Sequence, residues 1–144
     1  MPKKDYNQIV IGGGSAGLIT AYISNIVGAK CALIEKHKMG GDCLNTGCVP
    51  SKSIIKSAKV AHLIKTSKKY GVESSISNVN FERVMHRVHE VIAKIEPNDS
   101  MERYSKLGVD CFKGKAKIIS PNEVEVNGKK LTTKNITIAT GASP

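Results

Sequence analysis

In the first part of the chain, two short apolar runs flank a segment whose apolar residues recur at helical spacing. YNQIVIGGG is short, β-branched and closed by glycines, which predicts a buried strand over residues 6–12. AKCALIEK predicts a second strand over residues 29–35. Between them, SAGLITAYISNIVG predicts a helix that stops at Gly28, with apolar residues at Leu18, Ala21, Tyr22 and Val27. So short a crossover indicates a right-handed parallel strand–helix–strand unit.

Two longer segments in the middle of the chain show helical spacing. SKSIIKSAKVAHLIKTSKKYGV, from residue 51, predicts a helix with lysines outward and an inward face of Ile54, Ile55, Ala58, Ala61 and Leu63. NVNFERVMHRVHEVIAKIEP predicts a second helix that Pro97 kinks or ends. Its apolar positions are Phe81, Val84, Met85, Val88, Val91, Ile92 and Ile95. SMERYSKLGV then continues helically to Gly108.

Short strands and turns replace helices after residue 109. DCFKGKAKIIS, NEVEVNG and KKLTT are separated by the turn residues Ser120-Pro121-Asn122 and Asn127-Gly128. This pattern predicts a small antiparallel meander. NITIATGASP predicts a last strand that runs into Thr140-Gly141. The whole pattern predicts an α/β fold, with a parallel sheet, helices and an added meander.

Composition narrows the classes of protein to which the chain can belong. Its 144 residues, 40% of them apolar, suit one modest core. The net charge of +10 comes from scattered lysines with few aromatic residues, so we interpret it as solvated surface and expect no nucleic-acid partner. No apolar run approaches the roughly 20 residues that span a bilayer, and the first residues are unlike a signal peptide. We therefore expect a cytoplasmic protein without a membrane partner.

The glycines of GGGSAG form the spacing Gly12-x-Gly14-x-x-Gly17 between the first strand and the first helix. In this context the motif predicts dinucleotide binding. Gly12 permits the tight turn, Gly14 lets the backbone approach a pyrophosphate, and Gly17 allows close helix–strand packing. The helix start at Ser15-Ala16 offers N–H groups to phosphates. Glu35, which ends the second strand, is placed to accept hydrogen bonds from ribose hydroxyls.

The glycine motif leaves the nature of the nucleotide open. It does not distinguish FAD from NAD(P), and a glycine-rich turn that binds nothing is the alternative. GCVPSKS has the Lys-Ser pair of a P-loop, but Ser51 stands where that motif requires glycine before the lysine. A P-loop is therefore a poorer interpretation.

Two cysteines stand five residues apart in GGDCLNTGCVPSK. On an ideal helix such residues lie ~8.6 Å apart at Cα, whereas a disulfide needs about 4.4–6.8 Å. A bridge between Cys43 and Cys48 therefore requires a bent first turn, for which Gly47 and Pro50 are suitable residues. A constrained bridge of this kind is reducible, and helix N-terminal N–H groups would lower a thiol pKa.

Zinc ligation and inert core thiols are the alternatives to a redox couple. Zinc needs four ligands, and no second closely spaced pair accompanies Cys43 and Cys48. Cys31 and Cys111 fall in predicted strands and are interpreted as core residues. His37 is the nearest histidine, and His62, His86 and His89 fall on predicted helices without metal-site partners. We expect no metal site.

The order of these motifs resembles the class I pyridine nucleotide–disulfide oxidoreductases, which include dihydrolipoamide dehydrogenase, glutathione reductase and mercuric reductase. The matching residues are G-x-G-x-x-G, Glu35, GG-x-C-x4-C-x-P-S-K and IATGASP. The resemblance covers essentially the whole chain. It implies a Rossmann-like FAD-binding domain, with FAD bound at the glycine turn and Cys43–Cys48 as the redox-active disulfide.

The resemblance also implies a role for each matching residue. Cys48 would be the flavin-proximal sulfur that forms the charge-transfer thiolate, Cys43 the interchange thiol, and Lys52 the lysine near flavin N5. Asp42 stands where the family more often has Thr. The implied cofactor-binding set is Gly12, Gly14, Ser15, Ala16, Gly17, Glu35, Lys36, Gly41, Asp42, Cys43, Cys48, Lys52, Ala116, Thr140 and Gly141.

Members of the family are about three times as long as this chain. The resemblance therefore implies that residues 1–144 are the N-terminal, incomplete part of a FAD domain, without the nicotinamide-binding and dimerisation domains. In a complete homodimeric enzyme, NAD(P)H would reduce FAD, and electrons would pass through the cysteines to a small-molecule or protein disulfide or to a metal ion. The alternative function is a non-catalytic dinucleotide-binding module.

Overall fold

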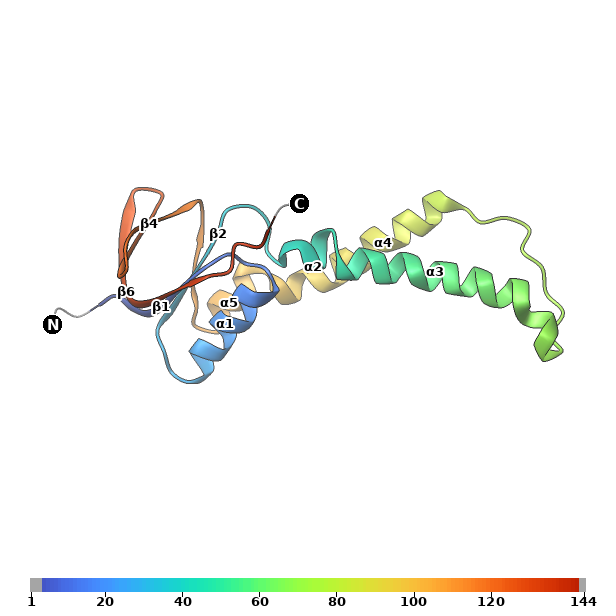
Figure 1. Cartoon of the computed structure of the whole chain (residues 1–144), viewed down its shortest axis with the longest axis horizontal. Coiled ribbons are helices and arrows are strands. Elements are labelled where there is room, and N and C mark those ends of the chain that lie inside the picture. Colours follow the sequence, from blue (N-terminus) through green and yellow to red (C-terminus); the bar gives the residue numbers. More distant parts are fainter. Residues whose placement is uncertain (1–3, 143–144) are drawn as a thin grey trace.

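A six-stranded sheet forms one end of the molecule, and two long helices project from it (Figure 1). The computed structural model describes residues 4–142. Ser143 and Pro144, which end the IATGASP motif, lie outside the described residues. The strands are β1 (Tyr6–Ile11), β2 (Cys31–Glu35), β3 (Asp110–Lys113), β4 (Ala116–Ser120), β5 (Glu123–Val126) and β6 (Lys129–Ile138). The α-helices are α1 (Ser15–Ile26), α2 (Gly41–Asn45), α3 (Cys48–Thr66), α4 (Phe81–Ile95) and α5 (Met101–Lys106).

The strand order is β3-β2-β1-β6-β5-β4. The pairs β3–β2, β2–β1 and β1–β6 are parallel. The pairs β6–β5 and β5–β4 are antiparallel. The predicted α/β fold with a parallel sheet and an antiparallel meander is therefore confirmed. The predicted β1–α1–β2 unit is also present, with β1 and β2 in parallel register from Gln8–Cys31 to Ile11–Ile34.

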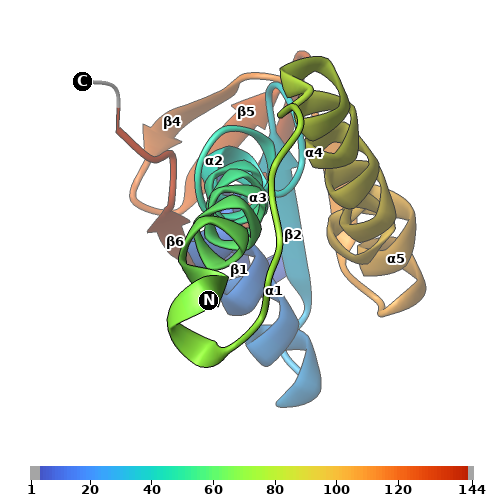
Figure 2. The same ribbon diagram turned by 90° about the vertical axis from the view of Figure 1, so that its right-hand side faces the viewer.

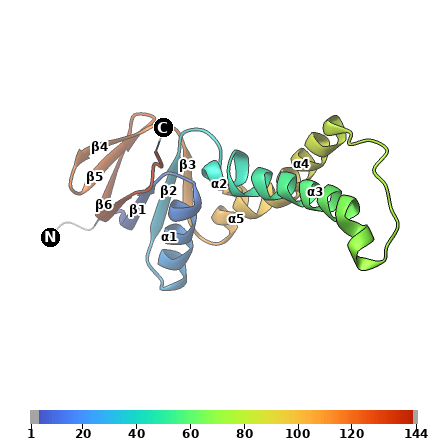
Figure 3. The ribbon, with the colours of Figure 1, turned by 45° about the vertical axis from the view of Figure 1, so that its right-hand side comes forward.

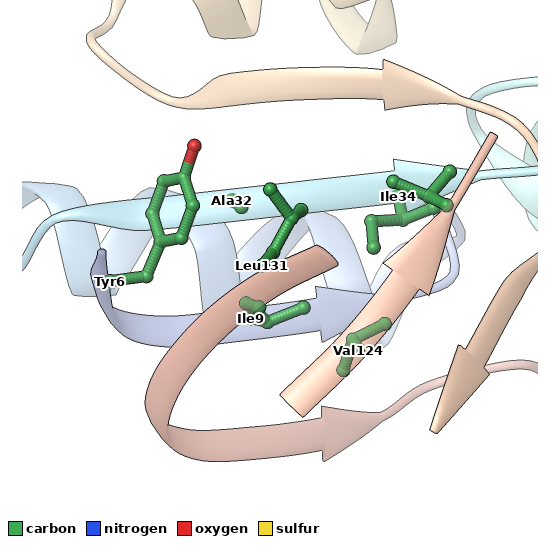
Figure 4. Packing of buried hydrophobic residues seen from close by; sticks show 7 residues of the cluster. Tyr6, Ile9, Ala32, Ile34, Val124 and Leu131 are labelled. Atoms are coloured by element: carbon green, nitrogen blue, oxygen red, sulfur yellow. The ribbon is translucent and has the colours of Figure 1, made fainter. Parts of the chain in front are cut away.

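Side chains of β1 and β2 enter two different cores. One set packs between the parallel strands and the meander, and consists of Tyr6, Ile9, Ala32, Ile34, Val124, Val126 and Leu131 (Figure 4). Helices α1 and α5 lie on the other side of these strands (Figure 3). The second set packs there and consists of Val10, Leu18, Ala21, Cys31, Leu33, Tyr104 and Val109. Because both faces of these strands are covered, their sequences read as continuous apolar runs.

Two strand assignments made from the sequence are wrong. DCFKGKAKIIS is not one meander strand, because it divides at Gly114, whose N–H donates to the Glu35 carbonyl at 2.9 Å. Its first half is β3, an edge strand parallel to β2, and only β4 joins the meander. KKLTT and NITI are also not separate strands. They form the single strand β6, which pairs antiparallel with β5 and then parallel with β1.

Helices α3 and α4 lie side by side and form a hairpin beyond the sheet (Figure 2). The short 3-10 helix η1 (Ser67–Tyr70) follows α3. Helix α4 ends at Ile95 and is followed by the 3-10 helix η2 (Glu96–Asp99), which contains Pro97, the residue predicted to kink or end the helix. The inward face predicted for α3 is wrong. Its buried position is Ser53, whereas Ile55 and Leu63 are 62% and 50% exposed. Since α3 packs on α4 alone beyond the first turns, most of its surface faces solvent.

The second helix of the hairpin agrees better with its predicted pattern. Val88 is buried, and Val84, Met85, Val91, Ile92 and Ile95 are half-buried, but Phe81 is 66% exposed. Asn80 caps α4 by accepting a hydrogen bond from the Arg83 N–H at 2.9 Å. In the part of the chain that the structure describes, no helix is long and apolar enough to cross a membrane.

Candidate functional site

The glycine turn connects β1 to α1 at the carboxyl edge of the parallel strands. Gly12 has a φ of +112°, and a Cβ there would lie 2.1 Å from the Ala139 carbonyl oxygen at the end of β6. A Cβ on Gly17 would lie 1.7 Å from the Gly12 carbonyl oxygen. Neither position can therefore carry a side chain. As the motif predicts, Gly12 is required by the tight turn and Gly17 by the close packing of the helix on the strand.

The N-terminus of α1 opens beside this turn. Its N-cap residue is Gly14, which has no side chain to accept hydrogen bonds from the first-turn N–H groups. Ser15 and Ala16, the first two helical residues, are exposed. Free N–H groups and the positive end of the helix dipole favour an anion at this point.

Glu35 joins the glycine turn to the segment that follows β2. One carboxylate oxygen accepts the Gly13 N–H and the other accepts the His37 N–H, each at 2.6 Å. The side chain is buried. Because a carboxylate offers about four lone-pair positions, Glu35 can still accept hydrogen bonds from ribose hydroxyls. The carboxylate thus has a structural role that the sequence did not indicate.

The cysteine-bearing segment lies directly against the glycine turn. The Gly40 N–H donates to the Gly13 carbonyl at 2.8 Å, and a Cβ on Gly41 would lie 2.6 Å from the Gly14 Cα. Asn45 then anchors α2, since its Nδ2 donates to the carbonyls of Met39 and Gly41 at 3.0 and 2.8 Å. The backbone contact between two glycines is what brings the cysteines close to the turn.

Cys43 and Cys48 belong to two different helices. Cys43 is half-buried in α2, and Cys48 is the exposed first residue of α3. The chain breaks between them at Gly47, whose N–H donates to the Asp42 carbonyl at 2.5 Å. The predicted distortion is therefore a break between helices, not a bent first turn within one.

The two thiols interact with each other. A hydrogen bond with Cys43, and then the charge of that thiol, raise the pKa of Cys48, while Lys52 acts in the opposite direction. The lowered thiol pKa expected from the helix terminus is therefore wrong for Cys48, because the neighbouring thiol has the larger effect. Such mutual influence is expected of two thiols that share one proton equilibrium.

Cys31 and Cys111 have the character of core residues. Cys31 is fully buried, and burial raises its pKa to about 11. Burial also raises the pKa of Cys111, which is half-buried. Raised pKa values disfavour the thiolate that nucleophilic attack and metal ligation need. Within residues 4–142, no group of three or more His, Cys, Asp or Glu side chains is arranged to hold a metal ion.

A cavity of about 470 Å³ collects most of the predicted cofactor-binding residues. The predicted residues in its wall are Gly12, Gly14, Ser15, Ala16, Glu35, Lys36, Gly41, Asp42, Cys43, Thr140 and Gly141. Ala116 lines a neighbouring cavity of about 180 Å³ that shares Gly12, Glu35, Lys36 and Thr140. Gly17, Cys48 and Lys52 line neither cavity.

Four residues of the cavity wall were missed by the sequence analysis, namely His37, Lys38, Asn45 and Ala139. The run Lys36-His37-Lys38 directly after Glu35 was a usable signal, since basic residues beside a phosphate site are expected. Asn45 and Ala139 gave no such signal. They reach the wall through the fold of α2 and through the parallel pairing of β6 with β1.

The family model for pyridine nucleotide-disulphide oxidoreductases matches residues 6–144. The chain belongs to this family. It is 43% identical over 142 residues to dihydrolipoyl dehydrogenase of Acholeplasma laidlawii, a match that covers 97% of this chain and 42% of the dehydrogenase. It is 35% identical over 139 residues to mercuric reductase of Bacillus cereus, covering 96% of this chain and 22% of the reductase.

A solved structure has the same fold. The Cu(II) complex of RclA from Escherichia coli, an HOCl-induced flavoprotein disulfide reductase, superposes with a TM-score of 0.76 at 25% identity. The match covers 96% of this chain and 28% of RclA. The chain thus spans less than half the length of each relative described here. The family and the fold of the resemblance are confirmed by these matches.

Proposed function

We propose that the chain is the FAD-binding part of an NAD(P)H-dependent disulfide oxidoreductase, with Cys43 and Cys48 as its redox-active pair. The observation that carries the proposal is a single cavity lined by the glycine turn, Glu35 and Cys43. When bound, FAD supplies two-electron transfer between a nicotinamide donor and the cysteines.

The residues present fit such a cofactor. The uncapped N-terminus of α1 and the backbone of Gly14 would hold the pyrophosphate, and Lys36 and Lys38 add positive charge to the wall. Glu35 would accept from the ribose while its carboxylate keeps the turn in place. The neighbouring cavity, lined in part by the apolar side chains of Ile11, Ile34 and Ala116, suits a base.

The cysteines supply thiol–disulfide exchange. The Cys43 thiolate would attack a substrate disulfide and release one substrate thiol, and Cys48 would then displace the second and close the Cys43–Cys48 bond. Two electrons and two protons return the pair to thiols. Lys52, one helical turn after Cys48, opposes the rise in the pKa of Cys48 that the Cys43 thiol causes, and would favour the Cys48 thiolate.

We propose that residues 1–144 correspond to the N-terminal part of a FAD domain. The chain spans 42% of the Acholeplasma dehydrogenase and 22% of the Bacillus cereus reductase. In the complete protein, a cytoplasmic homodimer, NAD(P)H is the electron donor. The substrate is a small-molecule or protein disulfide or, as the name of the reductase suggests, a metal ion. The chain alone would not turn over NAD(P)H.

A non-catalytic dinucleotide-binding module is the second candidate. One observation favours it, since Cys48 lines neither cavity although the redox interpretation places it beside the flavin. This candidate shares the FAD or NAD(P) site but predicts no exchange at the cysteines.

Cofactor binding and cysteine mapping together test the proposal. The chain should bind FAD in equilibrium dialysis, and tight NADH binding without FAD binding would contradict this. After thiol trapping at graded redox potentials, peptide mapping should show a Cys43–Cys48 bridge that dithiothreitol releases without unfolding. Cys31 and Cys111 serve as internal controls and should stay unpaired. FAD binding with no bridge at any potential would favour the non-catalytic module.

A further inference from the structure

Helix α4 contacts both of the helices that carry the cysteines of the proposed redox pair. Cys43 lies in α2 and Cys48 begins α3, and the chain joins the two helices through Thr46 and Gly47 alone. Helix α4 packs beside α3 and also contacts α2. The placement of one thiol relative to the other therefore depends on a third element as well as on the short connection between them.

Ser53 is the position at which a side-chain hydrogen bond joins α3 to α4. It is the buried residue of α3. Its carbonyl accepts a hydrogen bond from Arg87 Nη1 of α4 at 3.3 Å and one from the Ser57 hydroxyl of its own helix at 3.4 Å. Within residues 4–142, no other side-chain hydrogen bond and no ion pair joins α4 to α3 or to α2.

The guanidinium of Arg87 is therefore committed to a main-chain carbonyl. Glu90, the acidic residue three positions further along α4, pairs with His86, and Arg87 forms no ion pair in the described part of the chain. A charged donor makes a stronger hydrogen bond than a neutral one. The adjacent Val88 is 1% exposed, so packing holds the backbone from which Arg87 projects. A charged donor on a packed backbone is suited to holding α3 in place.

The carbonyl that Arg87 binds lies close to Cys48 along α3. Ser53 follows Cys48 by five residues, which is about 7.5 Å along a helix axis. Because main-chain hydrogen bonds link each turn of a helix to the next, fixing Ser53 also fixes the turn that begins with Cys48. Cys43 is held separately, through the two main-chain carbonyls to which Asn45 of α2 donates. Each thiol thus has its own anchor.

We propose that Arg87 is a positioning residue for the redox pair, and that it holds the first turns of α3 through the Ser53 carbonyl so that Cys48 stays within reach of Cys43. The inference rests on the proposed function, because it concerns the same two thiols. It predicts a change at the thiols when Arg87 is replaced. A contact that only stabilises the hairpin predicts a change in unfolding alone.

Equilibration with reduced and oxidised dithiothreitol, followed by thiol trapping and peptide mapping, measures how readily the bridge closes. Oxidised dithiothreitol takes two electrons and two protons from Cys43 and Cys48, so the protein disulfide forms as the disulfide of the reagent breaks. Arg87→Ala should lower the equilibrium constant for closure at least about fivefold, because closure must then also order the start of α3. Arg87→Lys, which keeps a charged donor, should recover part of this loss.

Arg83→Ala is the matched control for charge. It removes the same charge from α4 one turn earlier, and the helix cap at Asn80 uses only the backbone N–H of Arg83. Its equilibrium constant should equal that of the wild type. Arg87→Gln, which keeps a neutral donor, should show the same direction of change as Arg87→Ala and replaces it if circular dichroism shows that the alanine variant does not fold. A constant that the replacement of Arg87 leaves unchanged would overturn the proposal, even if urea unfolds the variant more easily.

The pH midpoint of Cys48 alkylation in the reduced chain is a second measurement, which does not need the bridge. Because the Cys43 thiol raises the pKa of Cys48, Arg87→Ala should lower the midpoint by separating the thiols. Loss of a positive charge alone would raise it, so the sign distinguishes positioning from electrostatics. A lowered midpoint in a chain that forms no bridge at any potential would contradict the proposed function and leave Arg87 as the residue that positions the thiols. An unchanged or raised midpoint would overturn the proposal.

Discussion

The parallel sheet and the α3–α4 hairpin use similar apolar residues in opposite ways. Ile9, Val10 and Leu33 in the sheet are fully buried, because the meander covers one face and α1 with α5 covers the other. Ile55 and Leu63 in the hairpin are 62% and 50% exposed, because beyond its first turns α3 packs on α4 alone. The difference teaches that burial depends on how many layers surround an element. We therefore expect the sheet to contribute more to the free energy of unfolding than the hairpin.

The largest expected difference between the two regions is in large-to-small substitutions. Leu33→Ala should lower the free energy of unfolding by about 2–5 kcal/mol, since it leaves a cavity between β2 and α1. Ile55→Ala, the matched change in the hairpin, should lower it by less than about 0.5 kcal/mol. Urea unfolding followed by circular dichroism measures both. Equal losses would show that the hairpin contributes as much stability as the sheet.

Two glycines with positive φ sharpen the comparison. Gly12→Ala combines a φ of +112° with a Cβ 2.1 Å from the Ala139 carbonyl oxygen, and should cost at least about 2 kcal/mol. Gly71→Ala has a φ of +75° but no atom within 4 Å of its Cβ, so it should cost about 1 kcal/mol. Thermal unfolding ranks the two variants, and a reversed ranking would contradict the close packing of β1 on β6.

A smaller effect is expected from two tyrosines. Tyr6 is buried and its hydroxyl donates to Asp110 Oδ2 at 2.9 Å, so Tyr6→Phe should cost about 1 kcal/mol. Tyr70→Phe, on a side chain that is 69% exposed, should cost nothing measurable. Unfolding curves near neutral pH separate the two.

The same tyrosine gives a pH dependence with a defined sign. Burial, followed by the hydrogen bond to Asp110, raises the pKa of Tyr6 above its ordinary value of 10.0. The unfolded chain then loses this proton first, so the contribution is complete below pH 10 and declines as the pH rises above it. Tyr6→Phe should remove that part of the alkaline loss of stability, and an unchanged alkaline profile would be the contrary result.

The smallest expected effect is a shift in thiol reactivity where the two regions meet. Because Cys43 raises the pKa of Cys48, Cys43→Ala should move the midpoint of Cys48 alkylation to lower pH. Lys52→Gln should move it to higher pH, because Lys52 favours the thiolate. Stopped-flow alkylation with peptide mapping measures the midpoints. If Cys43→Ala leaves the midpoint unchanged, the two thiols do not interact.

The sheet was predictable because strands covered on both faces leave continuous apolar runs. The two wrong strand assignments arose where the pairing partner changes without a clear break in the local pattern. Gly114 separates β3, which pairs with β2, from β4, which pairs with β5. Within β6, the pairing with β5 ends at Thr132 and the pairing with β1 begins at Thr133. The face of α3 was mispredicted because helical spacing identifies a face but not a neighbour to cover it. Ser53 is the buried position of α3, and no feature of the α3 sequence indicates this.

The candidate site was predictable where a backbone requirement selects the residue type. Gly12 and Gly14 belong to a motif whose mechanical reasons are visible in the sequence. His37, Asn45 and Ala139 were missed because they reach the cavity wall through tertiary contacts between segments distant in sequence. Helix α2 was missed because five residues are too short for a periodic pattern.

The central claim is that the cavity and the cysteine pair form one redox site. The most direct test is photoreduction of FAD bound to the oxidised chain, followed by thiol trapping and peptide mapping. The proposal predicts that the Cys43–Cys48 bridge opens as the bound flavin is reduced, without any nicotinamide present. A reduced flavin beside a bridge that stays closed would contradict it.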